Sequence, residues 1–207
     1  LQNENSNTTE KVEIIQNDLT FKLDPLFLTA EVYLSNSFYP QINIPSTINY
    51  QSNEYKVKSI GHSEANNIIE KITFSDDSEI KCIDLNDINC TALKIISIPP
   101  SVNKLLFKRD QNISKIIISP NNHNFKWIDD CFIVGKSNEN IEEFDVLVYA
   151  CFDIEQIIIK SNIKTIEPYC FSKCSNLQNV IFEEDSQLTT ISKHSFEYTQ
   201  IQNIKII

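Results

Sequence analysis

A short apolar phrase, Leu-x-x-Ile-x-Ile in its simplest form, recurs along this chain at a nearly fixed interval. Its spacings are 24, 20, 41, 23 and 24 residues, so every step is one or about two periods of roughly 23. Fixed periods of this length are typical of repeat proteins, whose units cannot bury their apolar sides alone and therefore stack on their neighbours. The sequence thus predicts an elongated coil of stacked units. The six copies begin at Ile69, Leu93, Ile113, Ile154, Leu177 and Ile201.

A second apolar phrase runs out of phase with the first. Each unit is therefore predicted to contain a strand, a tight corner, a short second strand and a helical turn with an apolar plug, such as Phe171 with Cys174. Proline follows the first strand at Pro45 and Pro99, where its missing N–H would end a ladder. The second phrase occurs at Val57-x-x-Ile60, Ile80-x-x-Ile83, Val102-x-x-Leu105, Phe125-x-x-Ile128, Ile163-x-x-Ile166 and Leu188-x-x-Ile191.

These phrases resemble the unit of the BspA-like leucine-rich-repeat family, L-x-x-I-x-I-P-x-x-V-x-x-I-x-x-x-A-F-x-x-C. The best match is Ile163-x-x-Ile166-x-x-x-x-Phe171-x-x-Cys174-x-x-Leu177, and the resemblance covers about residues 40–207. It implies a leucine-rich-repeat solenoid, β-dominated with short helical turns. It also implies a role in adhesion and host contact, because the family is associated with surfaces and secretions of anaerobic bacteria and protozoan parasites.

The chain divides into three predicted regions. Residues 1–18 form a polar leader that we expect to be mobile, and residues 19–56 alternate apolar and polar residues as an N-terminal β cap of two or three antiparallel strands. Residues 57–207 form the solenoid. The long step of 41 predicts an inserted β-hairpin near 129–150, because two β-rich runs flank the polar segment 136–143. Its loop could serve recognition, or it could be a tolerated surface loop.

Composition narrows the function classes. The chain has 28 acidic and 18 basic residues and a formal charge of -10, which argues against binding to nucleic acid or to an anionic membrane. No apolar run approaches the ~20 residues of a membrane span, so no membrane insertion is expected in this segment. The N-terminus does not resemble a signal peptide and the chain has no methionine, so we expect the translated start to have been removed.

Cysteine and glycine usage give no sign of catalysis. Cys90, Cys170 and Cys174 fall near plug positions, where a thiol behaves as a small buried hydrophobe, while Cys131 and Cys151 bracket the hairpin and are the best candidates for a disulfide. No cysteine or histidine has the spacing of a metal site, and two glycines are too few for a phosphate-binding loop. We therefore expect no metal, no cofactor and no enzymatic activity.

The candidate partner site is a row of outward-pointing strand residues. Neighbouring residues of a strand point to opposite faces, so the position between two inward anchors faces out. Three consecutive phrases place Ile117, Ile158 and Ile181 there, and the preceding outward position supplies Lys115, Gln156 and Asn179. An apolar ridge with a polar margin is a usual sign of a protein-binding site, although a strand of the hairpin could split the ridge. The alternative interpretation is β-propensity alone, since β-branched residues suit a ladder even when half exposed.

Two binding functions remain open. The first is a cell-surface or secreted module that uses the exposed face of the repeat sheet to bind a host or cell-surface protein. The alternative is an intracellular, cytoplasmic scaffold for protein interactions, which reduced plug cysteines fit equally well. The last phrase ends at Ile206-Ile207 without a polar cap, which predicts a fragment, a longer natural protein, or self-association through this C-terminal edge.

Overall fold

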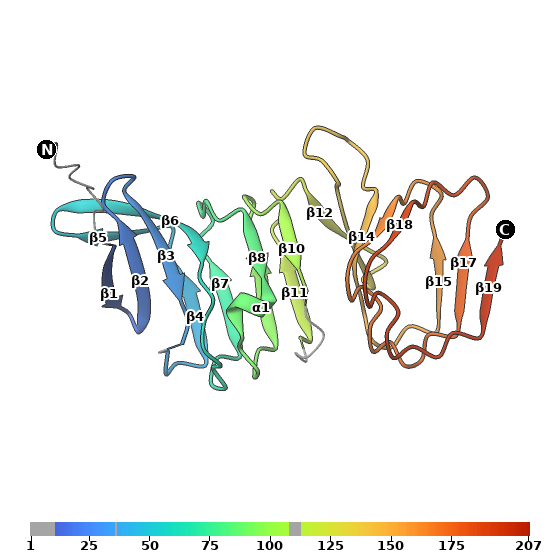
Figure 1. The fold of residues 1–207 in the computed structure, drawn as a ribbon, viewed down its shortest axis with the longest axis horizontal. Coiled ribbons are helices and arrows are strands. Elements are labelled where there is room, and N and C mark those ends of the chain that lie inside the picture. The colour runs from blue at the N-terminus through green and yellow to red at the C-terminus, as the bar shows by residue number, and fades with distance from the viewer. Residues whose placement is uncertain (1–10, 36, 108–112) are drawn as a thin grey trace, which may run out of the picture.

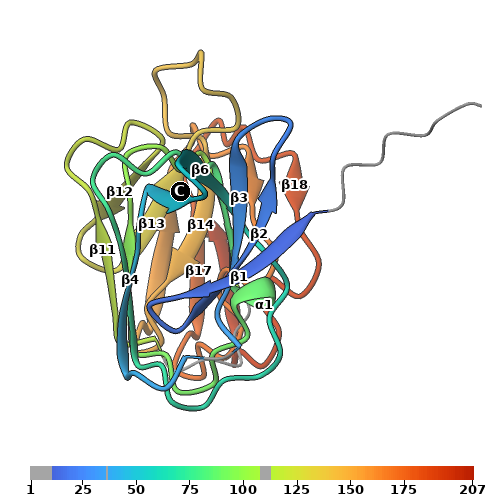
Figure 2. The ribbon, with the colours of Figure 1, turned by 90° about the vertical axis from the view of Figure 1, so that its left-hand side faces the viewer.

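The computed structural model describes residues 11–35, 37–107 and 113–207. Its strands succeed one another along a single long axis, and the two ends of the chain lie at opposite ends of that axis (Figure 1). Seen along the axis, the chain winds around an enclosed interior (Figure 2). The structure is therefore the predicted solenoid, built almost entirely from β-strands.

The first four repeat strands form one parallel ladder. Inward-facing isoleucines lie in register on adjacent rungs, with Ile42 opposite Ile72, Ile72 opposite Ile96 and Ile96 opposite Ile116. All are buried, so each rung adds apolar contacts to its neighbours. The strands are β4 (Gln41–Ile44), β7 (Lys71–Phe74), β9 (Ile95–Ile98) and β11 (Lys115–Ile118).

A second short ladder lies beyond the corners of these units. Strand β8 (Cys82–Asp84) pairs in parallel with β10 (Lys104–Leu106), as the out-of-phase phrase predicts. The only helix among the described residues is α1 (Leu85–Ile88), which Asp84 caps by accepting a hydrogen bond from the Asn86 amide at 2.8 Å. Elsewhere the third part of the unit is a series of tight turns.

The N-terminal cap is confirmed as a sheet, with three differences from the expectation. Strand β1 (Val12–Gln16) lies within the expected leader, because Val12 and Ile14 pack against the core; leader residues 1–10 are outside the described part. Strand β4 lies within the expected cap but belongs to the repeat ladder. The sheet is also not wholly antiparallel: the chain crosses through β4 and its corner before β6 joins β3 in parallel. The order is β1, β2 (Leu19–Asp24), β3 (Thr29–Tyr33), β6 (Asn53–Ile60) and β5 (Thr47–Tyr50).

The inserted hairpin is confirmed, and a third strand extends it. Strand β12 (Phe125–Ile128) pairs antiparallel with β13 (Phe132–Gly135), which pairs antiparallel with β14 (Val146–Ala150). The three-residue turn after β12 is tight because Asp129 and Asp130 both have positive φ, 51° and 50°, and the Cys131 amide donates to the Ile128 carbonyl at 3.1 Å. We call β12, β13 and β14 the partition sheet. Its loop, residues 136–145, projects beyond the ends of the strands (Figures 1 and 2).

Two parallel ladders continue the coil after the partition sheet. On one side β14 pairs with β16 (Thr165–Ile166), and β16 with β18 (Thr190–Ile191). On the other, β15 (Gln156–Ile159), β17 (Asn179–Phe182) and β19 (Asn203–Ile206) form a separate three-stranded sheet. The predicted plugs fill the turns: Phe171 is fully buried and stacks on Phe196 of the next unit, with ring centroids 4.8 Å apart.

The interior is divided into two apolar clusters, one on each side of the partition sheet. Ile96 and Ile116 lie in register, as do Ile157 and Val180, but β11 and β15 belong to different sheets. The partition sheet lies between two apolar clusters, with Ile133, Val148 and Tyr149 in the first and Val134, Leu147 and Ala150 in the second. Because both faces of β14 are buried, its sequence is continuously apolar instead of alternating.

Candidate protein-interaction groove

The structure brings together four of the six predicted site residues. Ile158 of β15 lies directly opposite Ile181 of β17, and Gln156 lies opposite Asn179. Ile158 is 43% exposed and Ile181 is half-buried, so the two isoleucines form a short apolar strip with a polar margin. These four residues are called the β15–β17 strip.

The other two residues lie elsewhere, because the partition sheet splits the row of three isoleucines, as the alternative expectation allowed. Ile117 pairs with Ser97 in the ladder of β11 and β9, because the partition sheet takes the place beside β11 that β15 was expected to occupy. Ile117 is exposed to a similar extent, 41%, but no other predicted isoleucine lies beside it. Lys115 lines a separate hollow of about 250 Å³ with Trp127 and Asp130.

A larger hollow, of about 600 Å³, lies between the partition sheet and β15, and we call it the edge groove. Gln156 and Ile158 of the β15–β17 strip line one wall. The opposite wall is the face of the partition sheet that is turned toward the C-terminal core, and it consists of Ile128, Phe132, Val134 and Leu147. The sequence did not predict these four residues as part of a site. The only sequence signal for this wall was the β-rich character of the insert.

Strand β15 presents an unpaired edge to this groove. The Asn179 amide donates to the carbonyl of Glu155 at 3.2 Å, and the Glu183 amide donates to that of Ile159 at 3.1 Å. Residues 155, 157 and 159 therefore direct their polar backbone groups toward β17, because alternate residues of a strand bond to opposite sides. The N–H and C=O groups of Gln156 and Ile158 point the other way, toward the groove. Among the described residues, no other strand pairs with β15.

The corresponding edge of β11 is closed. The same alternation directs the backbone of Ile116 away from β9, and its carbonyl accepts a hydrogen bond from the indole Nε1–H of Trp127 at 3.2 Å. The indole packs edge-on against Tyr149, with ring centroids 6.1 Å apart and an interplanar angle of 87°, and Tyr149 contacts Phe107 at 4.8 Å. An aromatic cluster thus occupies the junction between β11 and the partition sheet.

The rim of the edge groove carries excess negative charge. Lys160 is paired with Glu183 at 2.8 Å, and the Nζ of Lys126 lies 4.2 Å from the ring centroid of Phe144. The hydrogen bond from Lys160 lowers the pKa of Glu183, so this pair is ionised at neutral pH. Three further rim carboxylates, Asp129, Glu142 and Glu143, form no ion pair with another described residue.

The two ends of the loop of the partition sheet are connected through the buried carboxylate of Asp145. Asp145 is fully buried and accepts hydrogen bonds from the amide and the hydroxyl of Ser137 at 2.8 and 2.7 Å, with the Nζ of Lys164 at 3.5 Å. Burial alone would raise the pKa of Asp145, but the Ser137 hydrogen bonds and the charge of Lys164 outweigh it and lower the pKa. The side chain of Asn162 also donates to the Phe144 carbonyl at 3.0 Å.

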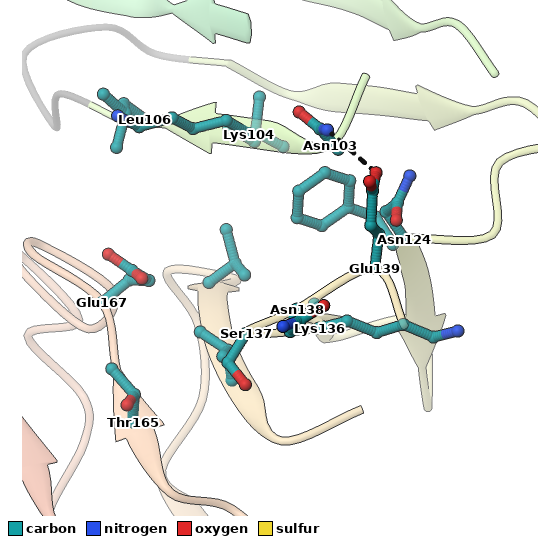
Figure 3. A pocket seen from close by; sticks show the side chains of 15 residues that line it. Asn103, Lys104, Leu106, Asn124, Lys136, Ser137, Asn138, Glu139, Thr165 and Glu167 are labelled. Carbon is teal, nitrogen blue, oxygen red and sulfur yellow. Dashed lines mark hydrogen bonds between the residues drawn. The ribbon is translucent and has the colours of Figure 1, made fainter. Parts of the chain in front are cut away.

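A second, more polar hollow of about 460 Å³ lies on the opposite face of the partition sheet (Figure 3). Its wall is β10, and its mouth is bridged by the side chains of Asn103 and Glu139 at 3.4 Å. Glu167 points into it, and burial raises the pKa of this carboxyl. Fewer of its lining residues are apolar than in the edge groove, so it is less suited to bind an apolar segment.

Three other features of the described residues bear on function. No disulfide links the six cysteines in the described part of the chain, so the candidate Cys131–Cys151 bridge is not formed, although the Cys151 amide donates to the Cys131 carbonyl at 2.8 Å. No group of three or more His, Cys, Asp or Glu side chains in the described ranges is arranged to hold a metal ion. Among the described residues, no helix is both long enough and apolar enough to cross a membrane.

Comparison with known proteins agrees with the repeat fold. Residues 135–207 match the model of the BspA type leucine rich repeat region (6 copies). This part of the chain is therefore similar to the BspA-type leucine-rich repeats, and the match supports a repeat-based protein-binding module. No curated protein matches the chain at a significant level.

Several solved structures are similar to the chain at low identity. A leucine rich cell surface protein from Faecalibacterium prausnitzii is 14% identical, with 94% of this chain and 76% of that chain covered and a TM-score of 0.37. The pneumococcal vaccine antigen PcpA is 15% identical, with 94% and 70% covered and a TM-score of 0.39. A leucine-rich repeat protein from Eubacterium ventriosum is 14% identical, with 94% and 72% covered and a TM-score of 0.43.

Proposed function

We propose that this chain is a non-catalytic protein-binding module of a cell-surface or secreted protein, with a role in adhesion or host interaction. The observation that carries the proposal is the β15–β17 strip beside the edge groove. Exposed apolar residues next to an apolar hollow with a polar rim are the arrangement expected of a protein-binding surface. The match of residues 135–207 to the BspA-type repeat model supports the same role, because leucine-rich-repeat proteins generally bind proteins.

The β15–β17 strip is the proposed contact surface. Ile158 and Ile181 supply apolar area, and Gln156 and Asn179 can hydrogen-bond to a partner from the same face. Ile117 and Lys115 lie on the other ladder, so they provide a matched comparison within the same molecule. Binding energy concentrates in a few central residues of an interface, so two isoleucines at its centre should dominate.

The test uses labelled recombinant chain and intact host cells. We expect Ile158→Ser with Ile181→Ser to weaken binding about tenfold, equivalent to ~1.4 kcal/mol, and Ile117→Ser to change it less than about twofold. Equal binding by the wild type and the double variant would contradict the proposal. An antibody against the chain that labels intact producing cells would support a surface location, whereas labelling only after permeabilisation would contradict it.

The alternative is an intracellular scaffold for protein interactions. The observation that favours it is that no disulfide links the six cysteines in the described part of the chain, which suits a reducing compartment. Thiol titration of the natural protein under denaturing conditions separates the two locations. Six titratable thiols would favour the intracellular scaffold, and any disulfide would favour the secreted module.

Self-association through β19 stays a prediction. The four residues of this strand are exposed, with Ile204 and Ile206 at 68% and 76%. Light scattering over a concentration series would show an average molar mass that rises toward that of a dimer if these strands pair, and a constant monomer mass if they do not.

A further inference from the structure

We propose that the edge groove binds an extended peptide segment, which adds to the open edge of β15 as a further strand. The proposal rests on the protein-binding function proposed above and specifies the chemistry of the partner at that site. The expected ligand alternates apolar side chains with basic ones. It would occupy the position beside β15 that a further rung of the ladder would otherwise fill.

The backbone of β15 is the first argument. The N–H and C=O groups of Gln156 and Ile158 face the groove, and no other described strand satisfies them. Water bonds to such groups at an open surface, but a polypeptide in extended conformation can match their donor and acceptor sequence along the whole edge. A globular partner with no free strand would leave these groups unmatched.

The wall opposite β15 is the second argument. Phe132, Val134 and Leu147 present an apolar surface toward the groove, and Val134 and Leu147 are almost fully buried. Alternate side chains of a bound strand point to opposite sides. One set would therefore contact this surface, while the other set would point outward beside Gln156 and Ile158, toward the rim and solvent.

The rim charges select the second set of side chains. Asp129, Glu142 and Glu143 have no ionic partner among the described residues, whereas Lys160 is already paired with Glu183. The formal charge of the whole chain, -10, adds a long-range attraction for cations. Lysine or arginine at alternate positions of the ligand therefore complements the rim, and glutamate there would be repelled.

The contrast with β11 shows that, of the two strand edges that border the partition sheet, only that of β15 is open. Both strands border the partition sheet, but the Ile116 carbonyl of β11 already accepts a hydrogen bond from Trp127. Strand addition at β11 would have to displace the indole and break its packing on Tyr149. No such group lies across the edge of β15 in the described part of the chain, so the two edges are expected to behave differently.

The experiment uses the whole chain, labelled with ¹⁵N, and the synthetic peptide acetyl-Val-Lys-Val-Lys-Val-amide as the probe. NMR titration should shift the amides of residues 156–159, and hydrogen exchange of the Ile158 amide should slow at least about tenfold at saturation, because that N–H becomes bonded in the complex. The same peptide with all five residues N-methylated loses the donors on both of its edges but keeps its side chains, and it should bind about tenfold more weakly. The peptide with glutamate in place of lysine should also bind more weakly.

Protein variants test the edge directly. Ile158→Pro removes an N–H that faces the groove while leaving the bonds to β17, so it should abolish binding of the peptide. Ile158→Thr keeps the N–H and the β-branched shape, so it should keep most of the binding. Asn43→Pro is a matched control: the bonds from Lys71 to Pro40 and from Ser75 to Ile44 show that the Asn43 N–H faces the outer edge of β4, far from the groove. It should leave binding unchanged.

The outcomes separate this proposal from the proposed function. Unchanged affinity of the N-methylated peptide for the wild type overturns strand addition, and this measurement decides even if Ile158→Pro does not fold. If Ile158→Ser with Ile181→Ser abolishes binding to cells while N-methylation and Ile158→Pro have no effect on the peptide, strand addition is wrong and the protein-binding function stands. If the peptide binds as expected but the chain does not bind cells, the groove chemistry stands and adhesion is wrong.

Discussion

The two strands that flank the partition sheet, β11 and β15, have the same pattern but different surroundings. Each carries three consecutive isoleucines, each is the terminal strand of a parallel ladder, and each exposes its middle isoleucine by about two fifths. Trp127 closes the edge of β11, whereas β15 faces the edge groove. An insert in a repeat array can therefore act asymmetrically, because it completes the ladder on one side and leaves an open strand on the other.

The largest effect should follow from removal of the aromatic closure. Trp127→Ala deletes a half-buried indole that packs on Tyr149 and bonds to Ile116, so we expect a loss of ~2–4 kcal/mol in the free energy of unfolding. Trp127→Phe keeps most of the packing and removes the hydrogen bond, and it should cost ~0.5–1.5 kcal/mol. Urea denaturation measures both changes. Equal stability of all three proteins would show that the indole does not close this edge.

A smaller effect is expected at the base of the loop. Asp145→Asn neutralises the carboxylate whose oxygens accept hydrogen bonds from Ser137 and lie beside Lys164. We therefore expect a loss of ~1–3 kcal/mol in the free energy of unfolding, measured by urea denaturation. The double variant Asp145→Asn, Lys164→Gln should cost less than the sum of its parts if the ion pair matters. Strictly additive losses would show that Lys164 does not interact with Asp145.

Acid should act on the same carboxylate. The pKa of Asp145 is lowered in the folded chain, so its contribution to stability is full above the ordinary aspartate pKa of about 3.9 and is lost as the pH falls through the lower folded value. The wild type should therefore lose stability more steeply than Asp145→Asn below about pH 4. Parallel stability curves for the two proteins in that range would contradict the assignment.

The repeat period was sufficient to predict the coil but not the division of its interior. The positions of Ile96, Ile116, Ile157 and Val180 were predicted correctly as inward-facing residues, because a period of about 23 and strand alternation determine them locally. The pairing of β11 with β15 was not determined, since it depends on where the insert packs. The apolar run Val146–Ala150 indicated a strand, and its continuous apolar character was the signal that both faces are buried.

The candidate site was predicted in part for the same reason. The β15–β17 strip lies within consecutive repeats, so spacing alone placed its four residues together. Ile117 and Lys115 were grouped with them by an incorrect assumption about adjacent strands. The groove wall at Phe132 and Leu147 belongs to the insert, where no period applies, and only the three-dimensional fold could show which face of it meets β15.

Exposed isoleucines on the two edges should have little influence on stability and an unequal influence on binding. Ile117→Ser and Ile158→Ser each remove a partly exposed side chain, so each should change the free energy of unfolding by less than about 0.5 kcal/mol. Ile158→Ser should weaken binding of the valine-lysine peptide about tenfold, and Ile117→Ser should leave it unchanged. A large loss of stability from Ile158→Ser would instead favour β-propensity as the reason for this residue.

The smallest expected effect concerns the charge at the far side of the groove. Lys160 lowers the pKa of Glu183 first through its hydrogen bond, which the amide of Ser161 supplements at 2.9 Å. Lys160→Ala should therefore raise the pKa of Glu183 toward the ordinary glutamate value, as NMR titration of its side-chain carboxyl would show. Lys94→Ala, which breaks a similarly exposed pair with Glu70 on the first ladder, should leave Glu183 unaffected. Because Lys160→Ala also makes the rim more negative, it should strengthen binding of the cationic peptide slightly, and a weaker affinity would show that Lys160 itself contacts the ligand.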